Sequence, residues 1–494
     1  MKKIWNPQNE GSGNEEIELN HGNRFLDLLD NTIFILHNQF ILNDMQPSPS
    51  SNVADRLAGF FVETSYEALP PEVIHEGKRC IVDGIGVALG GADHPSSHIL
   101  LKYCRTLRGK PEAQAWGHPD RLPVELAALV NGHQGHVLDF DDTFLPAETA
   151  LHGTVPLLSP LLSVAEQRHL PDKAVLRAFA LGFEAEARLA LALGRNHLLG
   201  GWHVTATTGP VGGAVGVGLL IGLNPARMRN AIGIAITHSG GVTAMFGSMS
   251  KAYQCGKAAE AGVRAALLAE MGFDSGMEPL THPQGYLNVA SSDRAFEKLT
   301  DRLGERYLIW ENGFKPYASG VVTHPLIDAL VQLRKEGVKA DSVARIEVRV
   351  NPFVLQVTGQ SEPKTGLEGK FSAYHCAAVA LLDGTARKTQ FTDARVNDPA
   401  AVSLRRKVAL IPDESFRKDE CTVLVRFLDG RKQERHVSGA SGTIENPMSD
   451  EALAEKFLDL AQTFIGSRAA QALDFVWSLD RLPDAAHLPP LLKG

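Results

Sequence analysis

The segment HVLDFDDTFLPAETALHGTVP, residues 136–156, gathers side chains that can move protons or hold a cation. It contains four acidic residues and two histidines within otherwise apolar sequence. Carboxylates and imidazoles commonly serve as general acids, general bases and metal ligands. The segment is therefore a metal site, a metal-free acid–base site or a solvated charged loop.

The spacing of the carboxylates argues against a metal. Asp139, Asp141 and Asp142 offer the oxygen ligands that hard cations prefer. A helical DDxxD magnesium motif needs carboxylates one turn apart, whereas two of these are adjacent and Pro146 ends any helix. His136 has another histidine three residues before it, but such helical histidines are more often packed in a core. We therefore predict no functional metal.

A second segment, GGWHVTATTGP, places His203 between a glycine pair and the start of a glycine-rich helix. The Gly-Pro step suits a helix start, and the free N–H groups at such a start can hold a carboxylate. By itself, the segment fits simple helix capping, with His203 packed beside Trp202.

Lysines occur in two later segments. Lys251 follows a run broken by glycines and comes just before the next helix, where a lysine is usually solvated. ENGFKPYASGVVTHP, at the boundary between two predicted domains, offers Lys315, Tyr317 and His324 where a cleft would form.

Together, these segments supply the parts of one site. Lys251 and Lys315 are cations for substrate carboxylates. His152, His203 and His324 can transfer protons, and the acidic loop can orient them. This set suits removal of a proton next to a carboxylate, with no cofactor required. The sequence contains no nucleophile-elbow or Walker motif. The glycine-rich run GGAVGVGLL lacks the strand that precedes a dinucleotide-binding motif.

Composition restricts the partners and the compartment. Hydrophobic residues make up 44% and charged residues 21% of the 494-residue chain, an ordinary globular balance. The net charge of −8, with no basic block, argues against nucleic acid and an acidic membrane surface. Five scattered cysteines without a C-x-x-C pair fit a reducing cytosol, and the polar start shows no signal peptide. We expect a cytoplasmic protein.

One uncharged stretch, residues 204–226, is long enough to raise the question of a membrane span. It is rich in glycine and threonine, and no second span accompanies it. We interpret it as a tightly packed core helix and expect a soluble protein with no membrane partner.

Periodicity predicts a mainly α fold with a smaller α+β domain. ARIEVRV alternates with the period of a half-buried strand, and Asp429-Gly430 separates two strand-like runs. Ser449 can cap a last helix with one apolar face. The predicted parts are a poorly ordered extension (1–51), a helical domain (52–313), an α/β lid (314–446) and a helical segment that returns to complete the helical domain (447–494).

The order and spacing of several motifs resemble the MmgE/PrpD family, which includes 2-methylcitrate dehydratases, cis-aconitate decarboxylases and iminodisuccinate epimerases. The resemblance runs from about Val53 to Pro489. It is carried by LPPEVIHEGKRCIVDGIGVALGG, HVLDFDDT, LHGTVPLLSP, GWHVTATTGPVGGA, SMSKAYQCGKAAEAGVRAALLAEMGF, FKPYASGVVTH, KFSAYHCAAVALLDG and FLDG…NPMSDEALAEKF.

The resemblance implies a helical domain with an α/β lid, a homodimer, and a cofactor-free site between the domains. It also implies that residues 136–156 form an acid–base and substrate-orienting loop without metal. The expected catalytic residues are Asp139, His152, His203 and Lys251, and the expected substrate-binding residues are Thr143, Lys315, Tyr317 and His324.

Departures from the family pattern leave the reaction open. Cis-aconitate decarboxylases carry an active-site tyrosine in the lid, whereas no tyrosine lies between Tyr317 and Tyr374. His152 is followed by Gly-Thr where many methylcitrate dehydratases have Pro-Ser-Asp, and Gln254 replaces a frequent histidine.

The first expectation is a cofactor-free lyase, a dehydratase of a small di- or tricarboxylate such as 2-methylcitrate. The alternatives are an epimerase of a dicarboxylate such as iminodisuccinate, a cis-aconitate decarboxylase-like enzyme, and a non-catalytic helical binding protein.

Overall fold

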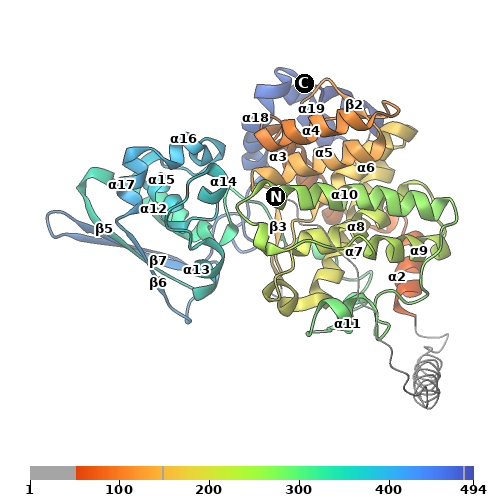
Figure 1. Cartoon of the computed structure of the whole chain (residues 1–494), viewed down its shortest axis with the longest axis horizontal. Helices are drawn as coiled ribbons and strands as arrows, with labels where there is room; N and C mark the ends of the chain where they lie inside the picture. Colours follow the sequence, from red (N-terminus) through yellow and green to blue (C-terminus); the bar gives the residue numbers. More distant parts are fainter. Residues whose placement is uncertain (1–51, 147–148, 482–483) are drawn as a thin grey trace, which may run out of the picture. The chain divides into compact units, whose positions relative to one another are not determined.

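The computed structural model describes residues 52–146, 149–481 and 484–494, and residues 53–494 form one compact unit. The predicted extension, residues 1–51, lies outside the described residues. Within the compact unit the chain builds a helical part and an α/β part with a small sheet (Figure 1). The expected class, mainly α with a smaller α+β part, is confirmed. The domain boundaries at 313/314 and 446/447 stay predictions.

The helical part is organised by α10 (Met249–Glu270), which packs against both α5 (Val124–Val137) and α8 (Val204–Leu220). A Cβ atom at Gly256 of α10 would lie 2.4 Å from the Leu129 oxygen of α5, so only glycine allows this approach. The start of α10 thereby meets the end of α5. The other helices of this part are α2 (Val53–Glu63), α3 (Pro71–Gly90), α4 (Pro95–Leu107), α6 (Thr154–Arg168), α7 (Asp172–Leu199), α9 (Pro225–Ile236) and α11 (Tyr286–Ala290).

Most of the uncharged stretch at 204–226 forms α8. Every residue from Val204 to Leu220 is buried, and α6, α7, α9 and α10 all pack against the helix. The interpretation of this stretch as a core helix is confirmed. Across 52–146, 149–481 and 484–494, no helix combines the length and apolar character needed to cross a bilayer.

The α/β part has a four-stranded sheet in the order β6-β5-β7-β8. β5 (Val343–Val350) pairs in parallel with β6 (Val408–Pro412) and antiparallel with β7 (Cys421–Phe427), which continues to β8 (Lys432–Val437). The predicted strand and hairpin are both confirmed, with Gly430 at φ +87° in the turn. Its helices are α12 (His324–Lys335), α13 (Pro352–Thr358), α14 (Gly366–Gly369), α15 (Ala373–Asp383), α16 (Asp393–Val396) and α17 (Pro399–Arg405).

Two features connect distant segments beside the site. β3 (Thr143–Phe144) pairs with β4 (Asn312–Gly313), just before the chain enters the α/β part. After the sheet, α18 (Asp450–Ile465) begins at Ser449, whose side chain accepts a hydrogen bond from the Ala452 N–H, and packs against α3. The remaining α-helices and strands of the described residues are β1 (Ala113–Gln114), β2 (Arg121–Leu122), α19 (Arg468–Trp477) and α20 (Leu488–Leu491).

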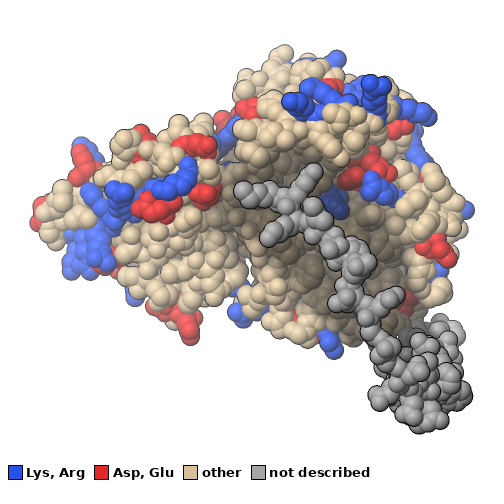
Figure 2. Space-filling view, viewed as in Figure 1, with Lys and Arg blue, Asp and Glu red and all other residues tan. Residues whose placement is uncertain are grey.

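Charges are mixed on the surface. On the face shown in Figure 2, basic and acidic side chains lie intermingled on both the helical and the α/β part. Among the described residues on this face, no continuous basic field is seen.

Candidate active site

A cavity of about 590 Å³ is lined by residues of both parts of the fold. Seven of the eight predicted site residues line it, which are Asp139, Thr143, His152, His203, Lys251, Lys315 and His324. Tyr317 does not, because its hydroxyl donates to Asp328 Oδ1 at 2.7 Å. Five phenylalanines are among the residues that line it, which are Phe246, Phe314, Phe353, Phe371 and Phe416.

Asp139 lies on a sharp turn. α5 ends at Val137, and Asp139 then adopts φ +50°, a left-handed conformation that non-glycine residues rarely hold. Such a conformation costs about 1–3 kcal/mol and persists only where surrounding contacts fix it. The side chain is buried at the cavity.

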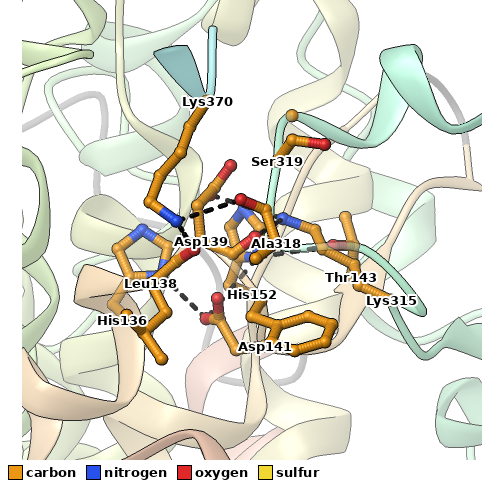
Figure 3. A network of polar contacts seen from close by, with 12 residues as sticks. His136, Leu138, Asp139, Asp141, Thr143, His152, Lys315, Ala318, Ser319 and Lys370 are labelled. Carbon is orange, nitrogen blue, oxygen red and sulfur yellow. Dashed lines mark hydrogen bonds and ion pairs between the residues drawn. The ribbon is translucent and has the colours of Figure 1, made fainter. Parts of the chain in front are cut away.

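Three buried lysines supply the contacts that fix this turn, and Figure 3 shows two of them, Lys315 and Lys370. They donate to the backbone oxygens of three consecutive residues: Lys370 Nζ to Leu138 at 2.5 Å, Lys315 Nζ to Asp139 at 3.1 Å and Lys456 Nζ to Phe140 at 2.6 Å. Lys370 also reaches the Ala318 oxygen at 3.0 Å, and Lys456 the Lys315 oxygen at 2.9 Å. We name these side chains the lysine clamp.

The Asp139 carboxylate lies between two ammonium groups. Its Oδ1 is 2.6 Å from Lys251 Nζ and 3.3 Å from Lys315 Nζ. Burial by itself would raise the pKa of Asp139, but the two cations outweigh it and hold that pKa well below its ordinary value. Its Oδ2 is buried and has no hydrogen-bond partner among the described residues, so it stays available to a ligand.

Lys251 stands in the first turn of α10 with one donor to spare. Its ammonium donates to Asp139 Oδ1 and, at 2.9 Å, to His136 Nε2. The rings of Phe246 and Phe371 lie 5.1 and 5.3 Å from Nζ. An ammonium has three N–H donors, so the third can bind a substrate carboxylate.

His136 has a defined tautomer. Because Lys251 can only donate, His136 Nε2 must accept and Nδ1 must carry the proton. That N–H donates to Asp141 Oδ2 at 2.7 Å. Burial, followed by the nearby Lys251 charge, holds the pKa of His136 well below its ordinary value, so the ring is neutral.

His152 is held in the same way. Its Nδ1 lies 2.8 Å from the Asp142 carbonyl oxygen, which can only accept, and 3.4 Å from Thr143 Oγ1. Its backbone N–H donates to Thr205 Oγ1 at 2.9 Å. Burial lowers the pKa of His152 well below its ordinary value. Nδ1 therefore bears the proton of a neutral ring, and Nε2 is left for the cavity.

His203 directly precedes α8, but the helix begins at Val204 and not at the Gly-Pro step that the sequence suggested, so Pro210 lies inside the helix. Its Nδ1 is 2.7 Å from Gln254 Oε1, and its ring lies 5.6 Å from that of His136 and 5.2 Å from that of Phe246. Burial and the Lys251 charge lower its pKa well below the ordinary value. His203 Nε2 is buried without a hydrogen-bond partner in the described part of the chain.

One group of side chains has the proximity of metal ligands. Potential ligand atoms of His136, Asp141 and His152 lie within 4.8 Å of one another. However, both imidazole Nδ1 atoms bear protons that are donated to Asp141 and to the Asp142 carbonyl, and Lys251 places a positive charge beside His136. These donors fit a hydrogen-bonded arrangement better than a cation, and the absence of a functional metal stays a prediction.

Asp142 connects the loop to two neighbouring elements through hydrogen bonds of its carboxyl group. Its Oδ2 accepts from Thr154 Oγ1 and from Asn312 Nδ2, both at 2.7 Å. Burial, helped by the neighbouring carboxylates of Asp141 and Asp83, raises the pKa of Asp142 to about 7. The carboxyl thus joins the start of α6 to β4.

The remaining predicted residue, His324, begins α12. Its Nε2 lies 3.3 Å from the Ser319 carbonyl oxygen, so Nε2 is the donor. Burial lowers the pKa of His324 to about 3, so the ring is neutral in the cavity wall.

Sequence reasoning missed several functional positions. It interpreted His136 as a core residue and considered Asp141 only as a metal ligand, and it singled out neither Lys370 nor Lys456. The signal for the two lysines was present, because they stand in the family-like segments KFSAYH and ALAEKF.

Comparisons with known proteins agree with this architecture. The MmgE/PrpD N-terminal domain matches residues 55–299, and the MmgE/PrpD C-terminal domain matches residues 317–481. Cis-aconitate decarboxylase of Homo sapiens is 30% identical over 448 residues, covering 86% of this chain and 91% of that protein. The Mus musculus enzyme of the same name is 28% identical over 462 residues (90% and 94%), and that of Aspergillus terreus 26% over 474 residues (90% and 96%). The chain therefore belongs to the MmgE/PrpD family.

Proposed function

We propose that the protein is a lyase that binds a small di- or tricarboxylate in this cavity and forms an enolate-like anion next to a carboxylate. The proposal rests on one observation. Ammonium groups with unused N–H donors and buried acceptor atoms without a hydrogen-bond partner among the described residues lie at the same cavity. Lys251 and Lys315 supply the donors, and His203 Nε2 and Asp139 Oδ2 are the acceptors.

Each group has a chemical role in such a reaction. Lys251 and Lys315 hold a substrate carboxylate and stabilise the negative charge that develops on it. A neutral imidazole, His152 or His203, takes or returns a proton at carbon or at a leaving hydroxyl, which contributes roughly 10²–10⁴ in rate. Asp139 keeps both lysines in position, and the residues present need no cofactor for these steps.

Decarboxylation of a cis-aconitate-like substrate is the first candidate reaction. It is favoured by the three relatives, each named cis-aconitate decarboxylase. The bond to the departing carboxylate breaks, its electron pair stays on carbon and spreads onto a neighbouring carboxylate, and a proton then adds to carbon. The aromatic lining from Phe246, Phe353 and Phe371 favours this loss of charge, because a carboxylate is poorly solvated beside such rings.

Dehydration of a 2-methylcitrate-like substrate is the second candidate. The resemblance places an active-site tyrosine in the lid of cis-aconitate decarboxylases, whereas no tyrosine is among the described residues that line this cavity. In dehydration one imidazole removes the proton from carbon and the other protonates the departing hydroxyl. Epimerisation of a dicarboxylate would use the same anion and return the proton to the opposite face.

One substrate panel tests these candidates. The purified protein is incubated in deuterated buffer with cis-aconitate, 2-methylcitrate and iminodisuccinate, and products are identified by NMR. Release of CO₂, loss of water, or deuterium incorporation with inversion distinguishes the three reactions. Lys251→Ala should abolish most of the turnover, whereas Lys257→Ala, an exposed lysine on the same helix, should not. No turnover of any substrate would reject the proposal for this substrate set and favour a binding protein.

We also propose that the protein is a cytoplasmic homodimer. The dimer rests on the family resemblance, and the compartment on five cysteines that are all buried free thiols. Light scattering of the purified protein gives the oligomeric state directly, and a monomer at working concentration would refute the homodimer.

A further inference from the structure

Gln254 holds one fixed orientation beside His203. Its Nε2 donates to the Val242 carbonyl oxygen at 3.2 Å, and a carbonyl can only accept. The amide oxygen Oε1 therefore faces His203 Nδ1, at 2.7 Å. Because Oε1 can only accept, the Nδ1 of His203 must carry a proton.

The second ring nitrogen follows from the first. A neutral imidazole carries one proton, so a proton on Nδ1 leaves Nε2 with its lone pair. His203 lines the cavity, and its Nε2 is buried with no hydrogen-bond partner among residues 52–146, 149–481 and 484–494. The lone pair is therefore available where a substrate would lie.

We infer that Gln254 is a positioning residue, which selects the Nδ1–H tautomer of His203 and so directs the Nε2 lone pair into the cavity, where Nε2 is the base that takes the substrate proton in dehydration or epimerisation. The role of the base rests on the proposed function, whereas the choice of tautomer does not.

A neutral partner suits this task better than a charged one. The titratable groups that face His203 are Lys251 on α10, His136 on α5 and Asp139 on the turn after α5. Burial, followed by the Lys251 charge, holds the pKa of His203 well below its ordinary value, so the ring stays neutral and able to accept a proton. A carboxylate in place of the amide would fix the same tautomer but would also stabilise the imidazolium, which has no lone pair. An amide fixes the tautomer without this effect.

The first experiment reads the tautomer without any substrate. In protein labelled with ¹⁵N-histidine, long-range ¹H–¹⁵N spectra distinguish Nδ1–H, Nε2–H and doubly protonated rings, and His203→Gln identifies the His203 signal. We expect Nδ1–H in the wild type. Gln254→Met has nearly the same length but no acceptor, and should shift the signal toward Nε2–H.

The second experiment reads the reaction with a substrate that loses a proton from carbon, 2-methylcitrate or iminodisuccinate, and turnover of cis-aconitate alone overturns the role of Nε2 as the base. Gln254→Met should lower kcat about tenfold or more and change KM less than threefold, because the lone pair no longer faces the substrate. Gln254→Glu should move the acid limb of kcat/KM upward by about one pH unit. The carboxylate stabilises the protonated ring, because a charged hydrogen bond is stronger than a neutral one by roughly 1 kcal/mol. Gln462→Glu, on the exposed face of α18, is the matched control and should do neither.

The outcomes separate the two claims. A wild-type Nε2–H signal, or the same signal in wild type and Gln254→Met, overturns the inference whether or not a substrate is found. The expected signals together with unchanged kcat and an unmoved acid limb overturn the role of Nε2 as the base. Failure of the whole panel rejects the proposed function, and the spectra still decide on Gln254.

Discussion

Replacing Lys370 by methionine should lower turnover at little cost to the fold. The Lys370 ammonium ties the α/β part to the turn that carries Asp139, through the carbonyls of Leu138 and Ala318. Methionine has a similar length but no donor, so the turn loses one of the three contacts that hold it. A misplacement of Asp139 that costs about 1.4 kcal/mol of transition-state stabilisation would lower kcat tenfold.

Two opposing contributions to stability nearly cancel in this variant. The two hydrogen bonds from a charged donor that are lost are worth about 1.5–3 kcal/mol each. Against this, burial lowers the pKa of Lys370 to about 7 from an ordinary 10.5. At roughly 1.4 kcal/mol per pH unit, the buried charge costs the folded state about 5 kcal/mol. The free energy of unfolding at pH 7 should therefore change by less than about 2 kcal/mol.

The dependence on pH is the decisive measurement. The unfolded chain keeps the Lys370 proton up to about pH 10.5, whereas the folded chain loses it near pH 7. The penalty is therefore complete below pH 7 and fades as the pH rises toward 10.5. Between pH 7 and pH 9, urea unfolding should show the wild type gaining about 2 kcal/mol relative to Lys370→Met.

Lys364→Met, an exposed lysine of the same part of the fold, is the control and should follow the wild type at every pH. If Lys370→Met shows the same pH dependence as the wild type, the lysine is not buried as a strained cation. If kcat is also unchanged, the lysine clamp does not position Asp139.

Three further predictions concern the cavity. His152→Gln and His203→Gln, which cannot titrate, should each lose roughly 10²–10⁴ in turnover with an unchanged circular dichroism spectrum, and near-normal turnover in both would reject the mechanism. Because burial keeps the pKa of both imidazoles well below the ordinary 6.5, the acid limb of the wild-type kcat/KM profile should lie below pH 6.5, and an acid limb above that value would contradict neutral bases. Exhaustive treatment with EDTA should leave the rate unchanged, and a loss restored by magnesium or zinc would show that a metal is required after all.

Sequence reasoning reached the residues whose roles follow from type and motif. Asp139, His203 and Lys251 could be selected because a family resemblance places them, and the structure brings them to one cavity. His136 was interpreted as core because helical spacing gave it no partner. Its partner, Asp141, follows the left-handed residue Asp139, and such a reversal of the chain is not visible in an amphipathic pattern.

Tyr317, the predicted site residue that does not line the cavity, shows the opposite limit. It stands two residues from Lys315, and proximity in sequence suggested a shared cavity. Its hydroxyl instead binds Asp328 on α12, whose other oxygen accepts from the Ser441 N–H, so the tyrosine joins elements of the α/β part. Neither partner could be inferred without the packing of α12.

The lysine clamp also determines when during biosynthesis the site can form. Asp139 belongs to the first third of the chain, but Lys456 is supplied by α18, near the C-terminal end. Contacts between residues so far apart require the closure of very long loops, which makes them slow compared with the formation of the helices themselves. A ribosome must therefore release almost the whole chain before the Asp139 turn acquires its final geometry. A chain that stops before α18 would carry every histidine of the cavity and still lack a completed site.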